Sequence, residues 1–266
     1  MKKLISFHTN GKGRSPEIEE KLAEKLESKG FLVKRVYDKN AELLVCIGGD
    51  GTFFDAIHKF NYPDVPIIGV NTGHLGFFQD VLPEKLDTFV DDYVNGNYKF
   101  QTLSLIRTGV KTKTHAFEHL SLNEITIRNT NFRSIHLNIY IDGKPIECYN
   151  GDGLVISTPT GSTAFNYSLR GSIVDPRLDL IQITPIAPMN SIAYKTLSSS
   201  ILIPAESSLK LVPAMERDRD LCIVRDGYNH ECTDITDIEV DYSDKKVRLI
   251  RSTEFDFWAN VSEKLL

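Results

Sequence analysis

Short apolar runs alternate with helix-like segments through the first hundred residues, a pattern typical of a parallel α/β layer. Four apolar runs predict strands, at residues 3–7, 32–36, 43–47 and 66–70. Apolar residues at helical spacing predict helices over residues 15–30, 53–60 and 83–95. Ser15 and Pro16 indicate the start of the first helix, and Gly30 its end. We therefore expect a Rossmann-like α/β domain with a parallel sheet over residues 1–100.

The apolar run at residues 43–47 is typical of a strand buried on both faces, and it leads directly into a glycine loop. That loop is Gly48-Gly49-Asp50-Gly51-Thr52. Its glycines would let phosphate oxygens approach backbone N–H groups, at the end of the strand where open α/β sheets bind ligands. An ordinary glycine-rich turn is the alternative. It leaves Asp50 unexplained, because a carboxylate in an anion-binding loop is costly unless it orders a metal or takes a proton.

The pattern changes near residue 100. Residues 134–141 alternate polar and apolar side chains, and Asp142-Gly143 is a strong hairpin signal. Further short apolar runs predict strands at residues 200–203, 209–212, 221–224, 238–242 and 247–250. We expect a mostly β, sandwich-like domain over residues 101–254, and an amphipathic helix at 255–266 that packs back on the first domain.

Composition narrows the possible partners and the compartment. The chain has 266 residues, enough for two hydrophobic cores, and a net charge of −5, which argues against nucleic acid as a partner. The N-terminus becomes polar after Phe7, too early for a signal peptide or a membrane span. The cysteines are widely spaced and form no C-x-x-C pair, as expected for reduced thiols. We expect a cytoplasmic protein with no membrane partner.

Residues 150–171 combine a predicted strand, a Ser/Thr-Gly turn and a helix start. Hydroxyls and free amides at a helix N-terminus suit a pyrophosphate or a ribose, and Phe165 and Tyr167 could flank a base. A capped helix packed by aromatic residues explains the segment equally well. Nearby in the chain, Asn123 and Glu124 lie inside an apolar run that predicts a strand. Both side chains could serve one site only at a strand edge or a bulge.

Together these segments resemble the NAD kinase family over most of the chain. The glycine loop at residues 48–52 is similar to that family's first motif, and Asn123-Glu124 to its Asn-Glu pair. Residues 71–77 resemble its N-x-G-x-L-G-F turn, residues 151–171 its second glycine-rich motif, and residues 183–188 its I-T-P-I-x-P stretch. The first motif alone is shared in outline with lipid kinases and phosphofructokinase-like enzymes. All five in this order are specific.

The resemblance implies ATP-dependent phosphorylation of the 2′-hydroxyl of the adenosine ribose of NAD, which gives NADP. Asp50 would accept the hydroxyl proton, and Gly48, Gly49 and Thr52 would hold phosphate. Mg²⁺ or another divalent cation would arrive with ATP, with no metal held tightly by the protein alone. Asn123 would contact the adenine and Glu124 the ribose. The full set of substrate-binding residues that the resemblance implies is Gly51, Asn123, Glu124, Asp152, Thr163, Ala164, Phe165, Asn166, Tyr167, Ser168 and Ala187.

Two residues depart from the family pattern. Phe165 stands where a tyrosine is common, which keeps a stacking face and loses a hydroxyl, and Asn150 stands where a basic residue often precedes the Gly-Asp-Gly. A lipid kinase and a non-catalytic nucleotide sensor are the competing hypotheses. The Asn123-Glu124 pair argues against the first, and Asp50 against the second. The resemblance also suggests a homo-oligomer, namely a tetramer, and leaves open whether polyphosphate replaces ATP and whether NADH is accepted.

Overall fold

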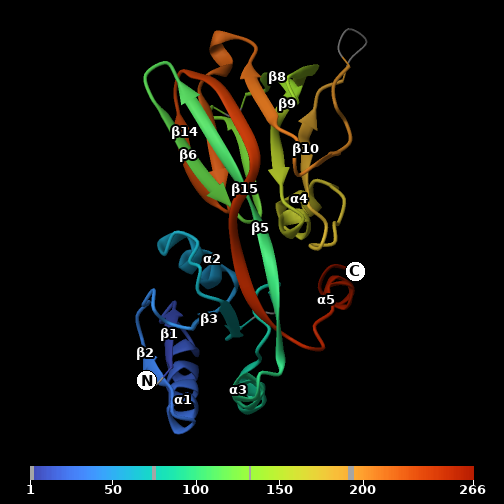
Figure 1. Ribbon diagram of the computed structural model, residues 1–266. Helices are drawn as coiled ribbons and strands as arrows, with labels where there is room; N and C mark the ends of the chain where they lie inside the picture. The colour runs from blue at the N-terminus through green and yellow to red at the C-terminus, as the bar shows by residue number, and fades with distance from the viewer. Residues whose placement is uncertain (1–2, 74–75, 132, 191–194) are drawn as a thin grey trace. The chain divides into compact units, whose positions relative to one another are not determined.

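The computed structural model describes residues 3–73, 76–131, 133–190 and 195–266 (Figure 1). The chain divides into two compact units. Unit 1 comprises Met1–Leu103 and Lys246–Leu266, and unit 2 comprises Ser104–Lys245. Within the described residues no helix is long and apolar enough to cross a membrane.

Unit 1 is the predicted α/β layer. Its sheet is parallel and has the order β15-β4-β3-β1-β2. The strands are β1 (Leu4–Thr9), β2 (Leu32–Lys34), β3 (Leu43–Gly48), β4 (Ile67–Asn71) and the end of β15 (Ile235–Ser252). The helices are α1 (Ser15–Ser28), α2 (Asp50–Lys59), the short 3-10 helix η1 (Pro83–Lys85), α3 (Leu86–Asn95) and α5 (Phe257–Leu265). The parallel sheet predicted from the apolar runs is confirmed.

The core of unit 1 is built from the apolar faces of these elements. Every residue of β3 is buried, as its unbroken apolar run predicts. Leu22 and Leu26 of α1 and Phe89 and Val90 of α3 pack into the same cluster. Gly96 ends α3 in the left-handed conformation with φ of 75°, as its position after the apolar stripe predicts.

Two helix starts differ from the prediction. Helix α2 begins at Asp50, inside the glycine loop, and not at residue 53. The cap of α1 is Arg14, and Ser15 is its first helical residue. The Ser15 hydroxyl donates to the hydroxyl oxygen of Thr72, 3.2 Å away.

Unit 2 is mostly antiparallel β structure, as predicted. Its main strand order is β14-β13-β7-β9-β8-β12-β15, with β10 also pairing with β9. The strands are β5 (Tyr98–Thr112), whose first residues belong to unit 1, β6 (Ala116–Ser121), β7 (Glu124–Asn129), β8 (Ile135–Ile141), β9 (Lys144–Ser157), β10 (Leu180–Pro188), β11 (Ile201–Pro204), β12 (Leu209–Pro213), β13 (Leu221–Arg225) and β14 (Tyr228–Cys232). Short helices occur at η2 (Thr160–Thr163), α4 (Phe165–Ser168) and η3 (Glu216–Asp218).

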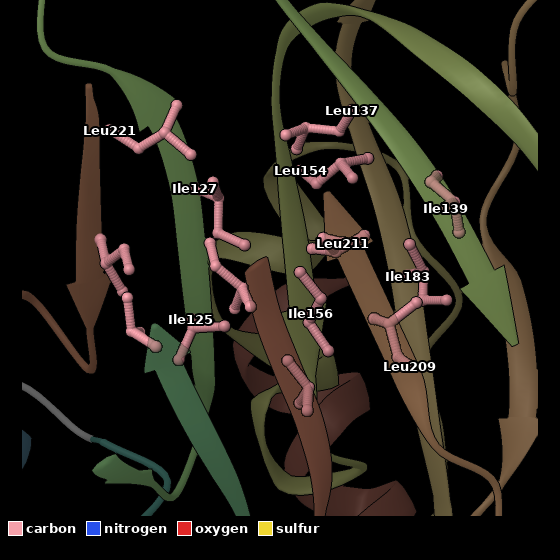
Figure 2. Packing of buried hydrophobic residues seen from close by; sticks show 14 of the residues in the cluster. Ile125, Ile127, Leu137, Ile139, Leu154, Ile156, Ile183, Leu209, Leu211 and Leu221 are labelled. Atoms are coloured by element: carbon pink, nitrogen blue, oxygen red, sulfur yellow. The ribbon is translucent and has the colours of Figure 1, made fainter. Parts of the chain in front are cut away.

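Alternate residues of these strands form the core of unit 2. Ile125 and Ile127 of β7, Leu154 and Ile156 of β9 and Ile183 of β10 lie side by side in it (Figure 2). Each of these side chains is fully buried. This apolar face fixes the register of β7 and β9, because a shift by one residue would turn every core side chain outward.

Two Asp-Gly pairs form two-residue hairpin turns. Asp142 and Gly143 join β8 to β9 with φ of 51° and 73°, which confirms the predicted turn. Asp226 and Gly227 join β13 to β14 in the same way, with φ of 43° and 89°. The separate strands predicted at residues 238–242 and 247–250 are instead one strand, β15. The polar residues between them are part of this strand, which begins in unit 2 and ends in unit 1.

Candidate functional site

The glycine loop lies at the carboxyl end of β3 and opens α2 (Figure 1). Gly49 is the extended residue before the helix, and a Cβ atom on Gly49 or Gly51 would meet no atom within 4 Å. Gly48 is needed for another reason, since a Cβ there would collide with the buried side chain of Thr52. The loop therefore presents open backbone at two glycines and close packing at the third.

The Asp50 carboxylate is held by backbone N–H groups. Its Oδ2 accepts from the N–H of Phe77 at 2.8 Å, and its Oδ1 from the N–H of Phe78 at 3.1 Å. The ring of Phe78 stacks on Phe53 of α2, with ring centroids 4.5 Å apart. A Cβ atom on Gly76 would collide with the carboxylate. Gly76, Phe77 and Phe78, which follow β4, therefore hold the Asp50 carboxylate in place, and we call these three residues the Asp50 seat.

Backbone bonds to β4 fix this seat. The N–H of Asn71 donates to the carbonyl of Val81 at 2.8 Å, and the N–H of Val81 donates to the carbonyl of Gly69 at 3.1 Å. The Gln79 amide donates to the carbonyl of Gly49 at 2.9 Å, which ties the seat to the glycine loop. His74 and Leu75, which belong to the motif-like turn at residues 71–77, lie outside the described residues.

Two cations act on this seat. Arg251 of β15 donates to the Phe77 carbonyl at 3.1 Å and is paired with Asp80, and Lys264 of α5 donates to the Gly76 carbonyl. Burial raises the pKa of Asp50 above its usual value. The N–H bonds from Phe77 and Phe78 and the charges of Lys264 and Arg251 oppose that rise. Asp50 is thus a largely desolvated carboxylate whose negative charge is partly balanced by nearby cations.

In unit 2, Asn123 and Glu124 lie at the entrance to β7. Asn123 occupies a bend and Glu124 is the first residue of the strand, so the prediction that both lie inside a strand is wrong for Asn123. The bend lets neighbouring side chains escape the strict alternation of a strand. Both residues are buried, with exposed fractions of 9% and 8%. Asn123 Oδ1 and Glu124 Oε2 have no hydrogen-bond partner among the described residues.

The predicted Ser/Thr turn packs directly on Asn123. The Thr158 hydroxyl donates to the carbonyl of Leu122 at 2.6 Å, and the Thr158 N–H donates to the carbonyl of Asn123 at 2.9 Å. A Cβ atom on Gly161 would collide with the backbone of Asn123. The structure therefore brings together two motifs that lie far apart in the sequence.

Glu124 differs from an ordinary surface carboxylate. Burial raises the pKa of Glu124 to about 8, and the negative charge of Asp226 adds to the rise. Near neutral pH the carboxyl is therefore mostly protonated, so it can donate one hydrogen bond as well as accept others.

Asp152 and Ala187 face each other across paired strands. Gly151 of β9 pairs with Pro188 of β10, and Gly153 with Ile186. Both Asp152 and Ala187 are exposed, and Ala187 has a φ of 44°, which is unusual for a residue with a side chain. The two glycines beside Asp152 serve packing, since Cβ atoms there would collide with the Tyr149 hydroxyl and the Ile127 carbonyl.

Residues 163–168 divide into exposed and buried members. Thr163, Ala164 and Tyr167 are partly exposed, and Phe165 and Ser168 are exposed. Asn166 is fully buried, and its amide bonds the carbonyls of Ser162 and Ser172 and accepts from the Thr184 hydroxyl. The Asn166 side chain is therefore committed to contacts within the protein.

The sequence patterns did not reveal several residues that contact the predicted site residues or the segments that hold them. Arg128 of β7 lies over the Phe165 ring at 6.0 Å and pairs across the strands with Gly153. Lys264 and Arg251 reach the Asp50 seat from the C-terminal part of the chain. Only Asp226 carried a visible signal, because it precedes a glycine in a hairpin-type pair. Its contacts depend on the pairing of β13 with β7, which no local pattern reveals.

A divalent cation brought by a nucleotide needs few protein ligands. The described residues contain no group of three carboxylate, imidazole or thiol side chains that could hold a metal ion. Mg²⁺ commonly binds through one or two carboxylates together with substrate phosphates. The described residues near the glycine loop therefore need not hold the ion by themselves.

Comparison with known families gives two matches that together span most of the chain. The family model of the ATP-NAD kinase N-terminal domain matches residues 8–98. The family model of the ATP-NAD kinase C-terminal domain matches residues 122–252.

Similar proteins match over nearly the full length. An NAD kinase of Finegoldia magna is 36% identical over 268 residues, covering 99% of this chain and 98% of that protein. An NAD kinase of Staphylococcus carnosus is 30% identical, covering 97% of this chain and 96% of that protein.

Solved structures share the fold. A yeast NADH kinase in complex with NADH superposes with a TM-score of 0.83 at 21% identity, covering 99% of this chain and 87% of that one. An NAD kinase from Archaeoglobus fulgidus in complex with ATP superposes with a TM-score of 0.76 at 20% identity, covering 94% of each chain.

Proposed function

The chain belongs to the NAD kinase family. We propose that Asp50 removes the proton from the reacting hydroxyl and that Asn123 and Glu124 bind the adenosine part of NAD. The enzyme phosphorylates NAD with ATP to give NADP. The lipid kinase and the non-catalytic sensor are set aside, since the full-length relatives are NAD kinases.

One observation carries the assignment of the adenosine site. Asn123 Oδ1 and Glu124 Oε2 are buried neighbours without a partner among the described residues. Buried polar atoms are normally hydrogen-bonded, and an unpaired one costs about 1–3 kcal/mol. The adenine amino group and the ribose hydroxyls of NAD are donors that would pair these oxygens. A ligand with donors at these positions would therefore satisfy buried acceptors that the protein alone leaves without a hydrogen bond.

The proposed role of Asp50 is to take the proton of the ribose 2′-hydroxyl while that oxygen bonds the γ-phosphorus of ATP. The bond from the γ-phosphorus to the bridging oxygen breaks in the same step, and ADP leaves. The Asp50 seat supports this role, because two backbone N–H groups fix the carboxylate and two cations limit the rise of its pKa. Phosphoryl transfer asks little covalent chemistry of the protein, so one placed base and phosphate-binding groups suffice.

Phosphate binding is assigned to the loop at residues 48–52. Gly49 and Gly51 leave their backbone open, and the N-terminus of α2 favours anions. Thr52 supports the loop by packing under Gly48. Mg²⁺, when bound with ATP, would neutralise phosphate charge.

The rest of NAD is assigned to exposed groups of unit 2. Asp152 and Ala187 present an exposed pair, and the exposed or partly exposed residues among 163–168 offer hydroxyls, backbone amides and the ring of Phe165. Asn166 would act through its backbone, because its side chain is engaged. The residues proposed to bind substrate are Gly51, Asn123, Glu124, Asp152, Thr163, Ala164, Phe165, Asn166, Tyr167, Ser168 and Ala187.

We extend the proposal to the setting of the enzyme. The cysteines Cys46, Cys148, Cys222 and Cys232 are free thiols, which supports a reducing, cytoplasmic compartment. A homotetramer is carried over from the family resemblance alone, and whether polyphosphate can replace ATP is left to the assay below.

A coupled assay of NADP formation tests the proposal. The purified enzyme is run with ATP and with polyphosphate, each with NAD and with NADH. Asp50→Asn should lower kcat at least about a hundredfold, the usual contribution of a general base, while its thermal unfolding curve stays that of a folded protein. Asp55→Asn is the matched control, an aspartate of the same helix whose side chain is 55% exposed. Near-normal turnover by Asp50→Asn would contradict the proposed mechanism.

A further inference from the structure

Asp226 lies in the tight turn between β13 and β14, and its side chain reaches back to the entrance of β7. Its Oδ2 accepts from the N–H of Leu122 at 2.8 Å. Its Oδ1 accepts from the N–H of Asn123 at 2.7 Å and from that of Glu124 at 3.2 Å. The Asp226 N–H donates in turn to the carbonyl of Glu124 at 3.1 Å. One residue thus binds three consecutive amides and one carbonyl of the Asn-Glu segment.

We propose that Asp226 is a positioning residue for the Asn123-Glu124 pair: its carboxylate fixes the backbone from which both side chains project. The inference rests on the NAD-binding roles proposed above for these two residues. No described part of the protein bonds Asn123 Oδ1 or Glu124 Oε2. The direction in which these oxygens point therefore depends mainly on the conformation of the backbone at Asn123 and Glu124.

The backbone at this point is held from two sides. Thr158 bonds the carbonyls of Leu122 and Asn123, whereas Asp226 takes the N–H groups. A bend has no strand partner to pair its amides, and unpaired buried amides are costly. The carboxylate of Asp226 supplies that pairing, and a charged acceptor bonds amides more strongly than a neutral one.

A role limited to forming the hairpin turn does not explain these contacts. Asp142 occupies the same place in the Asp142-Gly143 turn, also with positive φ, and its carboxylate accepts from the Ser208 N–H at 2.9 Å and the Ser207 hydroxyl at 3.1 Å. Those contacts hold a loop that contains none of the proposed site residues. The two turns therefore have the same local structure, but the Asp226 carboxylate bonds the backbone of Leu122, Asn123 and Glu124, whereas the Asp142 carboxylate bonds Ser207 and Ser208.

The experiment compares Asp226→Asn with Asp142→Asn in the full-length enzyme. Asparagine keeps the shape and the turn preference, but its NH₂ group would face an N–H donor and lose at least one bond. We expect Asp226→Asn to raise the KM for NAD at least about tenfold, the usual effect of losing a bond to a charged group, with the KM for ATP within twofold of wild type. Asp142→Asn should leave both KM values within twofold.

A second readout separates positioning from general stability. The charge of Asp226 adds to the raised pKa of Glu124, on which burial acts first. In Asp226→Asn the pH at which NAD binding changes with Glu124 ionisation should therefore move to lower values. Asp226→Glu, which keeps the charge and displaces the carboxylate, should raise the KM for NAD without that shift, and it serves as the second variant should Asp226→Asn not fold.

Opposite results have distinct meanings. An unchanged KM for NAD in Asp226→Asn, or an equal rise for ATP or in Asp142→Asn, would overturn the positioning role. Asn123→Ala and Glu124→Ala are measured alongside, because a glutamine at residue 124 would still resemble the protonated carboxyl. If these two variants bind NAD normally, the proposed adenosine site itself is wrong, whatever the Asp226 variants show.

Discussion

The Asp50 carboxylate packs against the α-carbon of Gly76 so closely that a side chain at that position would occupy the space of the carboxylate. The neighbouring Phe77 and Phe78 N–H groups can reach the carboxylate oxygens only because Gly76 lets the chain approach. The glycine in this turn thus serves the geometry of Asp50.

Gly76→Ala should therefore displace Asp50 and lower kcat about a hundredfold, since a shift of about 1 Å in a catalytic group can cost that much. Gly73→Ala in the same turn is the control, because a Cβ atom there would meet nothing within 4 Å. Steady-state kinetics with saturating NAD and ATP measure the effect. Equal activity of the two variants would show that the seat does not place the carboxylate.

Burial raises the pKa of Asp50, and Lys264 in α5 is one of the charged groups that oppose this rise. Lys264→Met should therefore raise that pKa further. Because the base must be ionised, the acid limb of the pH profile of kcat should move to higher pH, and the rate at pH 7 should fall. Lys264→Arg keeps the charge and should keep the limb near its wild-type position. An unmoved limb in the methionine variant would refute the electrostatic role.

Glu124 should make the protein less stable as pH rises. Its pKa is about 8 in the folded state, against an ordinary value of 4.5, so between these values the folded state binds more protons than the unfolded state. The free energy of unfolding therefore falls through this window, by at most about 1.4 kcal/mol per pH unit, and levels off above pH 8. Glu124→Gln removes this contribution.

Urea unfolding at pH 5, 6, 7 and 8 checks the prediction. As pH increases, the unfolding free energy of wild type should fall relative to that of Glu124→Gln, so the variant becomes relatively more stable. Parallel curves for the two proteins would mean that Glu124 titrates near its ordinary value.

Phe165 keeps an aromatic face without a hydroxyl. It is exposed, and Arg128 lies over its ring. Phe165→Tyr should lower the KM for NAD about two- to tenfold, the range expected for one added hydrogen bond of about 0.5–1.5 kcal/mol. Phe165→Leu, which removes the aromatic face, should raise it. If the tyrosine variant binds NAD no better than wild type, the hydroxyl has no partner on the ligand.

Local patterns in the sequence were enough to predict most elements of both units. The apolar run of β3, the stripe of α3 and the Asp142-Gly143 turn each correspond to a short-range preference of the backbone. Helix ends depend on more than local pattern, as at α2, which begins at Asp50 within a loop whose glycines do not favour a helix.

Motif resemblance supplied the Asp50 loop and the Asn123-Glu124 pair, but not the groups that hold them. Lys264 is separated from Asp50 by nearly the whole chain, and Asp226 from Asn123 by the strands that intervene between β7 and β13. Such contacts follow from strand pairing and packing, which depend on the entire core.

The sequence by itself indicated the strands and helices of unit 1 and several strands of unit 2, because these follow from adjacent or regularly spaced residues. Its resemblance to a known family pointed to the loop at residues 48–52 and to the Asn123-Glu124 pair. Only the tertiary structure decided that Gly76, Phe77 and Phe78 seat Asp50 and that Asp226 binds the Asn123-Glu124 backbone. The physical reason is that a carboxylate gains its partners from whichever backbone the packed core brings beside it, and no local preference encodes that choice.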